Sequence, residues 1–426
     1  MRNSIQPTAQ PFVTRLRARD YKSLKSCDVA FGPLTILTGF NAAGKSTVLD
    51  AIRLVRDALA LSPEGAIAKR GGLESVLRRG KEAGERGADS FAISLDLAFP
   101  DGQGGAAYEI EIGRDPAGRH PLVVINEKLT LTVRDEQARY AVDYAADGHR
   151  EVHGGEIPGA KLGVDALLLP IVGRLAPYDV LLDKLLAMRF YELDTTVLRE
   201  LDNTRAPHRQ LGERGEHLGQ VLGVLAEEHP MFKQAIDETM RWLVPSLLGV
   251  DRRMQGDYAT IQARFWTGDP HLPYWDAVNS GAVGSQDPRV QVFQSDELSE
   301  GTVQAMGVLV ALNQPEAISG AIPLVAIEEP EYAIHPARVA GLLAEMAEAA
   351  NRTQVIVTTQ SSELLDAEEM DPVWLRIVEM DEAVSRVGPL SDETIEILRK
   401  NPSYLPDMHR QGHLSPKDDR ERKAAR

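Results

Sequence analysis

The residues with the clearest chemical potential lie between positions 39 and 47, where the sequence reads Gly-Phe-Asn-Ala-Ala-Gly-Lys-Ser-Thr. This spacing is that of a P-loop, in which glycines let successive backbone N–H groups face the phosphates of a nucleoside triphosphate. Lys45 can reach the β and γ oxygens, and the Ser46 hydroxyl can bind Mg²⁺. The residues expected to line the triphosphate are Gly39, Asn41, Ala42, Ala43, Gly44, Lys45, Ser46 and Thr47.

Two adjacent acids, Glu328 and Glu329, follow the apolar run 322–327. Such a continuous run is typical of a strand buried on both faces of a parallel sheet, and α/β sheets bind ligands at the carboxyl ends of these strands. One carboxylate there can hold Mg²⁺ through water, while the next polarises an attacking water. The alternative is a solvated acidic turn, which the P-loop in the same chain disfavours.

A second apolar strand is predicted over 354–358, and it ends in Thr359, Gln360 and Ser361. If this strand joins the same sheet, its end lies near the same phosphates. The Gln360 amide could then form a hydrogen bond with a γ-phosphate oxygen or with the attacking water. A turn that is polar only for capping reasons remains the alternative.

A third polar signal is the sequence Leu-Ser-Glu-Gly-Thr at 298–302, which opens an apolar helical run. Ser299 stands at an N-cap position, and the helix N-terminus together with Gly301 makes a second candidate anion site. Taken alone, the pentamer is a weak signal that an ordinary capped helix explains better, and its position in the chain favours the functional interpretation.

The elements that must position these residues are arranged unevenly along the chain. The P-loop lies between a predicted strand and a helical pattern at 48–59, and a β-rich region follows it. From about residue 163 to 248 the apolar spacing turns helical. Strands are predicted at 12–16, 28–31, 34–37, 91–99, 108–112 and 129–133, and helices at 180–188, 197–201, 218–225 and 232–243.

These patterns predict an α/β P-loop NTPase with a β-rich N-terminal lobe and an inserted helical lobe. The expected divisions are an N-terminal lobe over 1–137, an inserted helical lobe over 138–320, a C-terminal core over 321–405 and a flexible tail over 406–426. The inserted lobe would carry Ser299, and the C-terminal core would carry the two acids and Gln360.

Composition narrows the class of protein. The net charge of -16 argues against a surface coated in basic groups for nonspecific nucleic-acid binding, although a local basic patch remains compatible with it. Cys27 is the single cysteine, which excludes an intramolecular disulfide and a cysteine-rich zinc site. No apolar stretch reaches 18 residues, so a cytoplasmic protein without membrane insertion is expected.

In this order, the four motifs resemble the ABC-type ATPase head of the SMC, RecF and overcoming-lysogenization-defect (OLD) proteins, and in particular the stand-alone AAA-family ATPases of bacterial DNA-maintenance and antiphage systems. The motifs that carry the resemblance lie between residues 12 and 366, and the middle of that range resembles the family only in its general pattern, without a motif. It implies that Lys45 and Ser46 bind ATP and Mg²⁺, that Glu328 is the Walker B metal residue and that Glu329 is the general base. It also implies a dimer, in which Ser299 and Gly301 of the signature motif contact the γ-phosphate held by a second subunit.

Two positions depart from the family pattern. Walker B usually ends in Asp-Glu, and here it is Glu328-Glu329, which keeps the charge and lengthens the reach by one methylene. Gln360 stands where the family generally has a switch histidine, and glutamine cannot become cationic. Stabilisation of charge on the γ-phosphate should therefore be weaker, and hydrolysis slow or stimulated by a partner.

The leading hypothesis is an ATPase that dimerises on nucleotide, as a homodimer or higher homo-oligomer, and gates DNA binding or a separate effector protein such as a nuclease or toxin. One alternative is a weakly hydrolysing regulatory module, which Gln360 favours. The other is the ATPase subunit of a membrane transporter, which the long separation between Ser46 and Leu298 disfavours.

Overall fold

The P-loop strand lies in the middle of a parallel sheet at the centre of the molecule. The structure is a computed structural model, and it describes residue 7 and residues 10–80, 87–99, 102–134, 136–145, 149–154, 162–268 and 287–417. Among these residues, the central sheet has six strands in the order β17-β16-β3-β15-β14-β9. Their bounds are Val384–Gly388, Leu375–Asp381, Leu34–Thr38, Gln354–Thr359, Leu324–Glu328 and Arg189–Tyr191.

The strands β3, β14 and β15 are parallel neighbours, which brings their carboxyl ends to one edge. All five residues of β3 and all six of β15 are buried, including their threonines and Gln354, as expected for strands inside a parallel sheet. Helices cover both faces of this sheet: α1 (Lys45–Ala60) lies on one face, and α9 (Glu300–Asn313) and α11 (Val339–Ala349) pack on the other. The predicted strands for Walker B and for the switch segment are confirmed in the same sheet.

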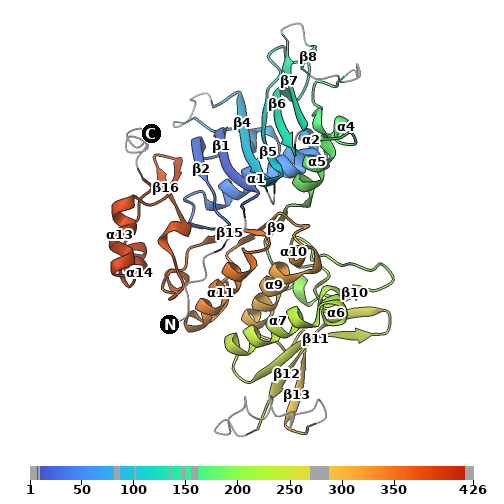
Figure 1. Ribbon diagram of the computed structural model, residues 1–426, viewed down its shortest axis with the longest axis vertical. Helices are drawn as coiled ribbons and strands as arrows, with labels where there is room; N and C mark the ends of the chain where they lie inside the picture. Colours follow the sequence, from blue (N-terminus) through green and yellow to red (C-terminus); the bar gives the residue numbers. More distant parts are fainter. Residues whose placement is uncertain are drawn as a thin grey trace.

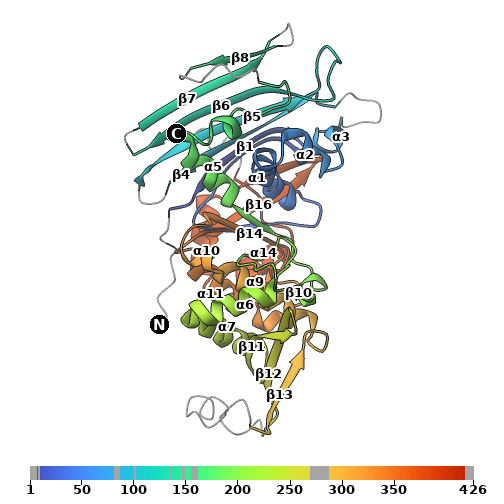
Figure 2. The same cartoon turned by 90° about the vertical axis from the view of Figure 1, so that its right-hand side faces the viewer.

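An antiparallel sheet covers α1 from its other side (Figure 2). In the described residues it has seven strands in the order β2-β1-β4-β5-β6-β7-β8. Their bounds are Leu24–Ala30, Val13–Tyr21, Ser90–Ala98, Gly104–Gly113, Val123–Val133, Glu136–Tyr144 and Arg150–His153. This is the predicted β-rich lobe, and it extends two strands beyond the predicted segments. The proposed division between residues 137 and 138 falls inside β7.

The inserted lobe contains a small sheet as well as helices (Figure 1). Its helices α6 (Leu218–Glu228) and α7 (Pro230–Leu243) are close to the predicted ones, whereas the predicted helix at 197–201 is only a short 3-10 turn, η2 (Val197–Arg199). Strands follow where no strand was predicted: β10 (Asp202–Asn203), β11 (Leu247–Gln255), β12 (Tyr258–Trp266) and β13 (Val290–Gln294). The alternation of Ile261 and Ala263 with Gln262 and Arg264 in β12 is the period-two pattern of a sheet with one buried face.

Shorter elements connect these layers. They are α2 (Pro63–Ala68), α3 (Leu73–Val76), α4 (Leu169–Val172), α5 (Tyr178–Ala187), α10 (Pro315–Ile318), η3 (Pro336–Arg338), α12 (Ser362–Leu365) and η4 (Pro372–Trp374). Within the described part of the chain, no helix is both long and apolar enough to span a bilayer.

The C-terminal segment is ordered further than predicted. Helix α13 (Asp392–Lys400) leads into α14 (Tyr404–Arg410), so the first part of the tail predicted to be flexible is helical. The cause is burial, since Leu405, His409 and Leu414 all lie below a tenth exposed against the body of the protein. Positions 418–426 lie outside the described residues.

Candidate nucleotide-binding site

The P-loop joins the end of β3 to the start of α1, and residues of β16 and β17 pack closely against it. A Cβ atom on Gly39 would lie 2.0 Å from the Val378 carbonyl oxygen, and one on Gly44 would lie 2.1 Å from Ser385 Oγ. Gly44 also has φ +107°, a conformation that residues with a side chain rarely adopt. Gly39 is therefore required by close backbone packing, and Gly44 by its own backbone conformation and by the Ser385 side chain. Since Gly44 caps α1 without a side-chain hydrogen bond, the first N–H groups of the helix stay available for an anion.

The remaining loop residues differ in exposure. Asn41 and Ala42 are exposed, Ala43 is buried, and Thr47 is half-buried at the first turn of α1. The Ala43 N–H donates to the Phe40 carbonyl at 3.2 Å, which closes the loop into a turn. The loop thus presents its backbone outwards, as the motif predicts.

Lys45 is folded back across its own loop. Its Nζ donates to the carbonyl oxygens of Gly39 at 2.8 Å and Phe40 at 3.0 Å. Burial lowers the pKa of this ammonium, although the nearby carboxylates of Glu329, Glu331 and Glu328 act in the opposite direction. The held ammonium lies among acidic groups at the strand ends and can exchange its carbonyl partners for phosphate oxygens.

Ser46 and Glu328 are in direct contact, as a shared metal position requires. The Ser46 hydroxyl donates to Glu328 Oε2 across the gap between α1 and β14. Burial raises the pKa of the Glu328 carboxyl, so this group gains from a nearby cation. Both residues line a cavity of about 280 Å³ together with Thr47, Asp50 and Glu192.

These donors fit Mg²⁺. Mg²⁺ at a P-loop is usually held by one or two protein oxygens together with phosphates and water, so a hydroxyl and a carboxylate suffice. Among the described residues, no group of three or more His, Cys, Asp or Glu side chains is arranged to hold a metal ion.

Glu329 and Gln360 meet at the ends of adjacent strands. In the register of β14 and β15, Glu328 lies opposite Thr358, and the Glu329 N–H donates to the Thr358 carbonyl at 3.1 Å. Glu329 has φ +43°, a left-handed conformation that turns the chain sharply after the strand. Its Oε2 accepts a hydrogen bond of 3.1 Å from Gln360 Nε2. The structure therefore brings together the two residues that the sequence predicted to act on the attacking water.

Ser299 forms the predicted N-cap of α9. Its Oγ accepts from the Thr302 N–H at 3.2 Å and lies 2.8 Å from Thr302 Oγ1, and the residue is exposed. A Cβ atom on Gly301 would lie 2.2 Å from the Ala333 carbonyl oxygen, so glycine is needed for the close approach of the segment that follows Walker B. The hydrogen bonds of the Ser299 side chain are local to this cap, and they do not join it to the P-loop of its own chain.

Sequence reasoning missed a buried acid beside the site. Glu331 accepts a hydrogen bond from Thr359 Oγ1, and its other oxygen, Oε2, has no hydrogen-bond partner among the described residues. Burial raises the pKa of this carboxyl. Its place two residues after Glu329 was visible, but nothing in the sequence indicated that the chain turns inwards there.

Three further residues near the site were also missed. Ser385 Oγ donates to the Ala43 carbonyl at 2.7 Å and supports the P-loop from β17. Glu192 follows β9, whose register with β14 sets it beside Glu328, and it shares the cavity with Ser46. His409 reaches the end of β3 from α14. None of the three belongs to a recognisable motif, and only Glu192 had a signal, as a lone acid after a short apolar run.

The geometry can support chemistry at the terminal phosphate of a nucleotide. An ammonium, a hydroxyl in contact with a carboxylate, and a second carboxylate with an amide partner converge at one edge of the sheet. These group types are ones that phosphoryl transfer to water uses.

Comparisons with known proteins find relatives of this chain. Residues 250–366 match a family described as "AAA domain, putative AbiEii toxin, Type IV TA system", and positions 299, 328, 329 and 360 lie within that range. The chain is 26% identical over 376 residues to a protein of Thermus scotoductus named OLD nuclease. That alignment covers 86% of this chain and 62% of the relative, so the chain spans less than two thirds of the relative's length.

A solved structure gives the same answer for the fold. The SMC head bound to the C-terminal winged-helix domain of ScpA superposes with a TM-score of 0.51 at 16% identity, covering 90% of this chain and 99% of the SMC head. In fold, this chain is a mixed α/β protein with the architecture of an SMC head.

Proposed function

We propose that the chain binds ATP with Mg²⁺ and hydrolyses it to ADP and phosphate. The observation that carries this proposal is the convergence of Lys45, the Ser46–Glu328 pair and the Gln360–Glu329 hydrogen bond at one edge of the parallel sheet. A fold shared with ATPase heads agrees with it.

In the proposed mechanism, Glu329 accepts the proton of the attacking water. Gln360 holds the Glu329 carboxylate through Oε2, which leaves Oε1 to face the water. Lys45 neutralises charge on the phosphate oxygens, and the N–H groups at the start of α1 hold the phosphates in place. When bound between Ser46 and Glu328, Mg²⁺ supplies further neutralisation of the phosphate charge. Because Gln360 cannot carry a positive charge, the unassisted reaction is expected to be slow.

We further propose that two heads pair on nucleotide. Ser299 is exposed at the N-terminus of α9 and forms no bond with its own P-loop, so this anion site is available to a second subunit. Phe40 in the P-loop is 61% exposed, and Tyr332, three residues after Glu329, is 56% exposed. Large exposed apolar side chains on both sides of a polar site favour burial against a partner.

The proposed output of pairing is control of DNA or of an effector protein. The relative named OLD nuclease, the family description that mentions a toxin and the SMC head bound to ScpA each associate this fold with such partners. DNA maintenance or antiphage defence in the cytoplasm is the setting that we propose for this chain, with a nuclease or toxin as a separate effector.

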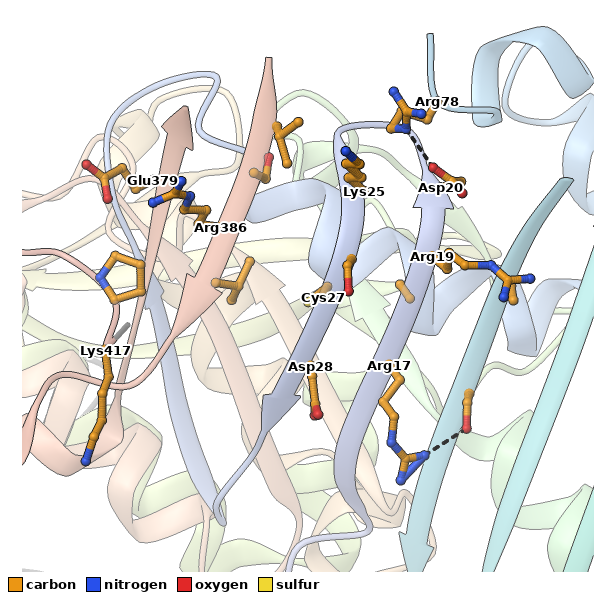
Figure 3. A pocket seen from close by; sticks show the side chains of 18 of the residues that line it. Arg17, Arg19, Asp20, Lys25, Cys27, Asp28, Arg78, Glu379, Arg386 and Lys417 are labelled. Atoms are coloured by element: carbon orange, nitrogen blue, oxygen red, sulfur yellow. Dashed lines mark hydrogen bonds and ion pairs between the residues drawn. The ribbon is translucent and has the colours of Figure 1, made fainter. Parts of the chain in front are cut away.

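A groove on the antiparallel lobe is our candidate surface for DNA (Figure 3). It lies between β1, β2 and β17, has a volume of about 1190 Å³ and is lined by six basic and four acidic side chains, a basic excess in a chain of net charge -16. Several of the cations are already paired, for example Arg19 with Glu111 at 2.9 Å and Arg78 with Asp20 at 2.6 Å. Phosphates would compete with these surface pairs, so binding should be weak and sensitive to salt. The basic residues are Arg17, Arg19, Lys25, Arg78, Arg386 and Lys417.

A second candidate function is a regulatory module that binds ATP and hardly hydrolyses it. Gln360 is the observation that favours it, since the amide replaces a group able to become cationic. The role of transporter subunit has no such support in the structure.

The Glu329→Gln substitution tests the proposal. The amide can still accept the hydrogen bond from Gln360, so ATP affinity should change by less than about threefold, whereas loss of the base should slow phosphate release by about 10²–10⁴-fold. Phosphate release is measured on purified protein with and without DNA, and ATP affinity with a fluorescent analogue. The matched control is Glu368→Gln, which neutralises an exposed acid outside the site.

Three outcomes separate the candidates. Turnover that survives Glu329→Gln contradicts the assignment of the base. A wild-type protein that binds ATP but releases no phosphate under either condition supports the regulatory module. Failure to bind ATP at all overturns both.

A further inference from the structure

A buried histidine from the C-terminal helix links the two nucleotide-facing loops. His409 lies on α14 and is 7% exposed. Its Nε2 lies 3.0 Å from Thr38 Oγ1, and its Nδ1 lies 2.8 Å from Ser362 Oγ. Thr38 is 0% exposed and Ser362 is 7% exposed, so all three polar groups are removed from water. A single ring therefore bridges β3 and α12, elements that are more than 300 residues apart in sequence.

Thr38 and Ser362, the two hydrogen-bond partners of His409, adjoin the loops that would contact the nucleotide. Thr38 ends β3 and is followed directly by Gly39 of the P-loop. Ser362 begins α12, two residues after Gln360. If either loop moves when a phosphate binds or leaves, the movement is transmitted to His409 through Thr38, which is bonded to Gly39, or through Ser362, which lies two residues after Gln360.

The bridge fits a neutral imidazole. Burial lowers the pKa of His409, and the charge of Lys45 lowers it further. A neutral ring has one N–H donor and one acceptor nitrogen, and each hydroxyl can donate or accept. Thr38 and Ser362 can therefore both be satisfied with either tautomer, one hydroxyl donating to the ring and the other accepting from it.

A second contact joins the same segment to the P-loop. A Cβ atom on Gly412 would lie 2.8 Å from Phe40 Cε2, so the turn after α14 lies directly against the loop's exposed aromatic ring. Leu405 and Leu414 are buried in the core on either side of His409. Because these apolar contacts hold the segment down, the histidine is not needed merely to dock the helix.

We propose that His409 is a positioning residue of the ATPase site, which ties the P-loop strand to the switch segment and makes α14 respond to the state of the nucleotide. This inference rests on the proposed ATPase function. Its partners are the two loops of its own chain, and its effect on the reaction passes through the placement of Gln360 and Glu329. Helix α14 is then the element through which an effector protein could read or set the rate of hydrolysis.

The test uses His409→Ala with His413→Ala as the matched control, since His413 is an exposed histidine in the same segment. Loss of the two hydrogen bonds should lower kcat about tenfold, with ATP affinity within about threefold of wild type. The second readout is amide exchange in residues 404–412 with and without ATP. ATP should slow this exchange in the wild type and in His413→Ala, and the slowing should be lost in His409→Ala.

Thr38→Val and Ser362→Ala keep the inference testable if His409→Ala fails to fold. Each removes one hydroxyl from the bridge and should lower kcat by part of the full loss, and each combined with His409→Ala should add nothing further. Unchanged kcat in these variants, or exchange in α14 that responds to ATP equally in all of them, overturns the inference.

Failure of the proposed ATPase function is distinguishable from failure of this inference. If the wild type binds ATP but releases no phosphate, hydrolysis is wrong and the exchange measurement alone decides the coupling. If the wild type hydrolyses ATP and His409→Ala does so at the same rate, only the positioning role is wrong.

Discussion

The contact between Gly44 and Ser385 makes a quantitative prediction about how the P-loop is supported. Gly44 has φ +107°, and a Cβ atom added there would lie 2.1 Å from Ser385 Oγ and 2.9 Å from Ser385 Cβ. Gly44→Ala should therefore fail for two separable reasons, the backbone conformation and the collision. Ser385→Gly removes both colliding atoms and leaves the backbone conformation as it is.

The magnitudes follow from these two causes. A side chain at a strained φ costs about 1–3 kcal/mol. Forcing an extra carbon into a packed site costs about another 1–3 kcal/mol. Gly44→Ala should then cost about 2–6 kcal/mol in the wild type, and about 1–3 kcal/mol when introduced into Ser385→Gly. In that background the backbone cost remains, and the nearest side-chain atom is Ser23 Oγ at 3.1 Å, a contact that a small side-chain shift relieves.

The assay is a double-mutant cycle on the protein without nucleotide. Urea unfolding gives the free energy of unfolding for the wild type, the two single variants and the double variant, with comparison restricted to variants of equal m value. The expected coupling between the sites is about 1–3 kcal/mol. Costs that add to within about 0.5 kcal/mol would refute the reasoning, because they would show that β17 does not press on the loop.

Three other predictions concern residues around the site. Burial raises the pKa of Glu331 in the folded protein, so the stability linked to this group is full below its ordinary pKa and is lost as pH rises through the folded value. Glu331→Gln does not titrate, and its melting temperature relative to wild type should therefore rise between pH 5 and pH 8. Gly301→Ala should lose about 1–3 kcal/mol of stability, because its Cβ would lie 2.2 Å from the Ala333 carbonyl oxygen; thermal unfolding measures this. Ser299→Arg should abolish ATP-dependent pairing, seen by light scattering with Glu329→Gln as the background, while ATP binding by the single head is retained.

Each of these predictions has a control and a contrary result. For Glu331→Gln, the exposed Glu368→Gln controls for the amide itself, and a melting difference that falls with rising pH would contradict the sign. For Gly301→Ala, the control is Gly32→Ala, whose added Cβ would approach no closer than 3.4 Å. For Ser299→Arg, equal losses of pairing and of ATP binding would show that Ser299 acts within its own subunit.

The strands that carry the site were predictable because their burial is complete. A strand inside a parallel sheet must be apolar at nearly every position, and 322–327 shows this throughout. The second strand is apolar at 355–357, and its polar ends Gln354 and Thr358 are buried as well. The polar residues that follow them then had to lie at one edge. The contact between Gln360 and Glu329 is the direct consequence, and it confirms that reasoning.

The sheet in the inserted lobe was missed for a physical reason. Strand β11 begins with buried residues and ends with Arg252, Arg253, Met254 and Gln255, which are partly or fully exposed, so its apolar pattern continues that of α7 and then stops. Helix α9 shows the converse, since it is buried nearly all round and therefore has little amphipathic pattern. In β11 and in α9, burial against the rest of the protein decides which positions are apolar, so the apolar spacing of the segment does not show its secondary structure.

Most of the support around the site could not be predicted from the sequence. Ser385, His409 and Glu331 act through contacts between segments that are distant in sequence, and each is an ordinary residue in its own neighbourhood. Glu192 is the exception, because it had a local signal as a lone acid after a short apolar run. Its place beside Glu328 still depends on the pairing of β9 with β14.

The pairing of β3 also constrains how the chain acquires its fold. Leu34 in β3 pairs with Val355 in β15, and Ile36 pairs with Leu375 in β16. The central strand β3 can therefore pair only after segments more than 300 residues later in the sequence have been translated. At bacterial or eukaryotic rates of synthesis this delay is on the order of tens of seconds. The antiparallel lobe, whose strands mostly pair with near neighbours in sequence, can form during that time. A nascent chain on the ribosome would therefore carry a complete P-loop sequence for most of its synthesis without a functioning nucleotide site, which becomes possible only when the last strands of the parallel sheet have emerged.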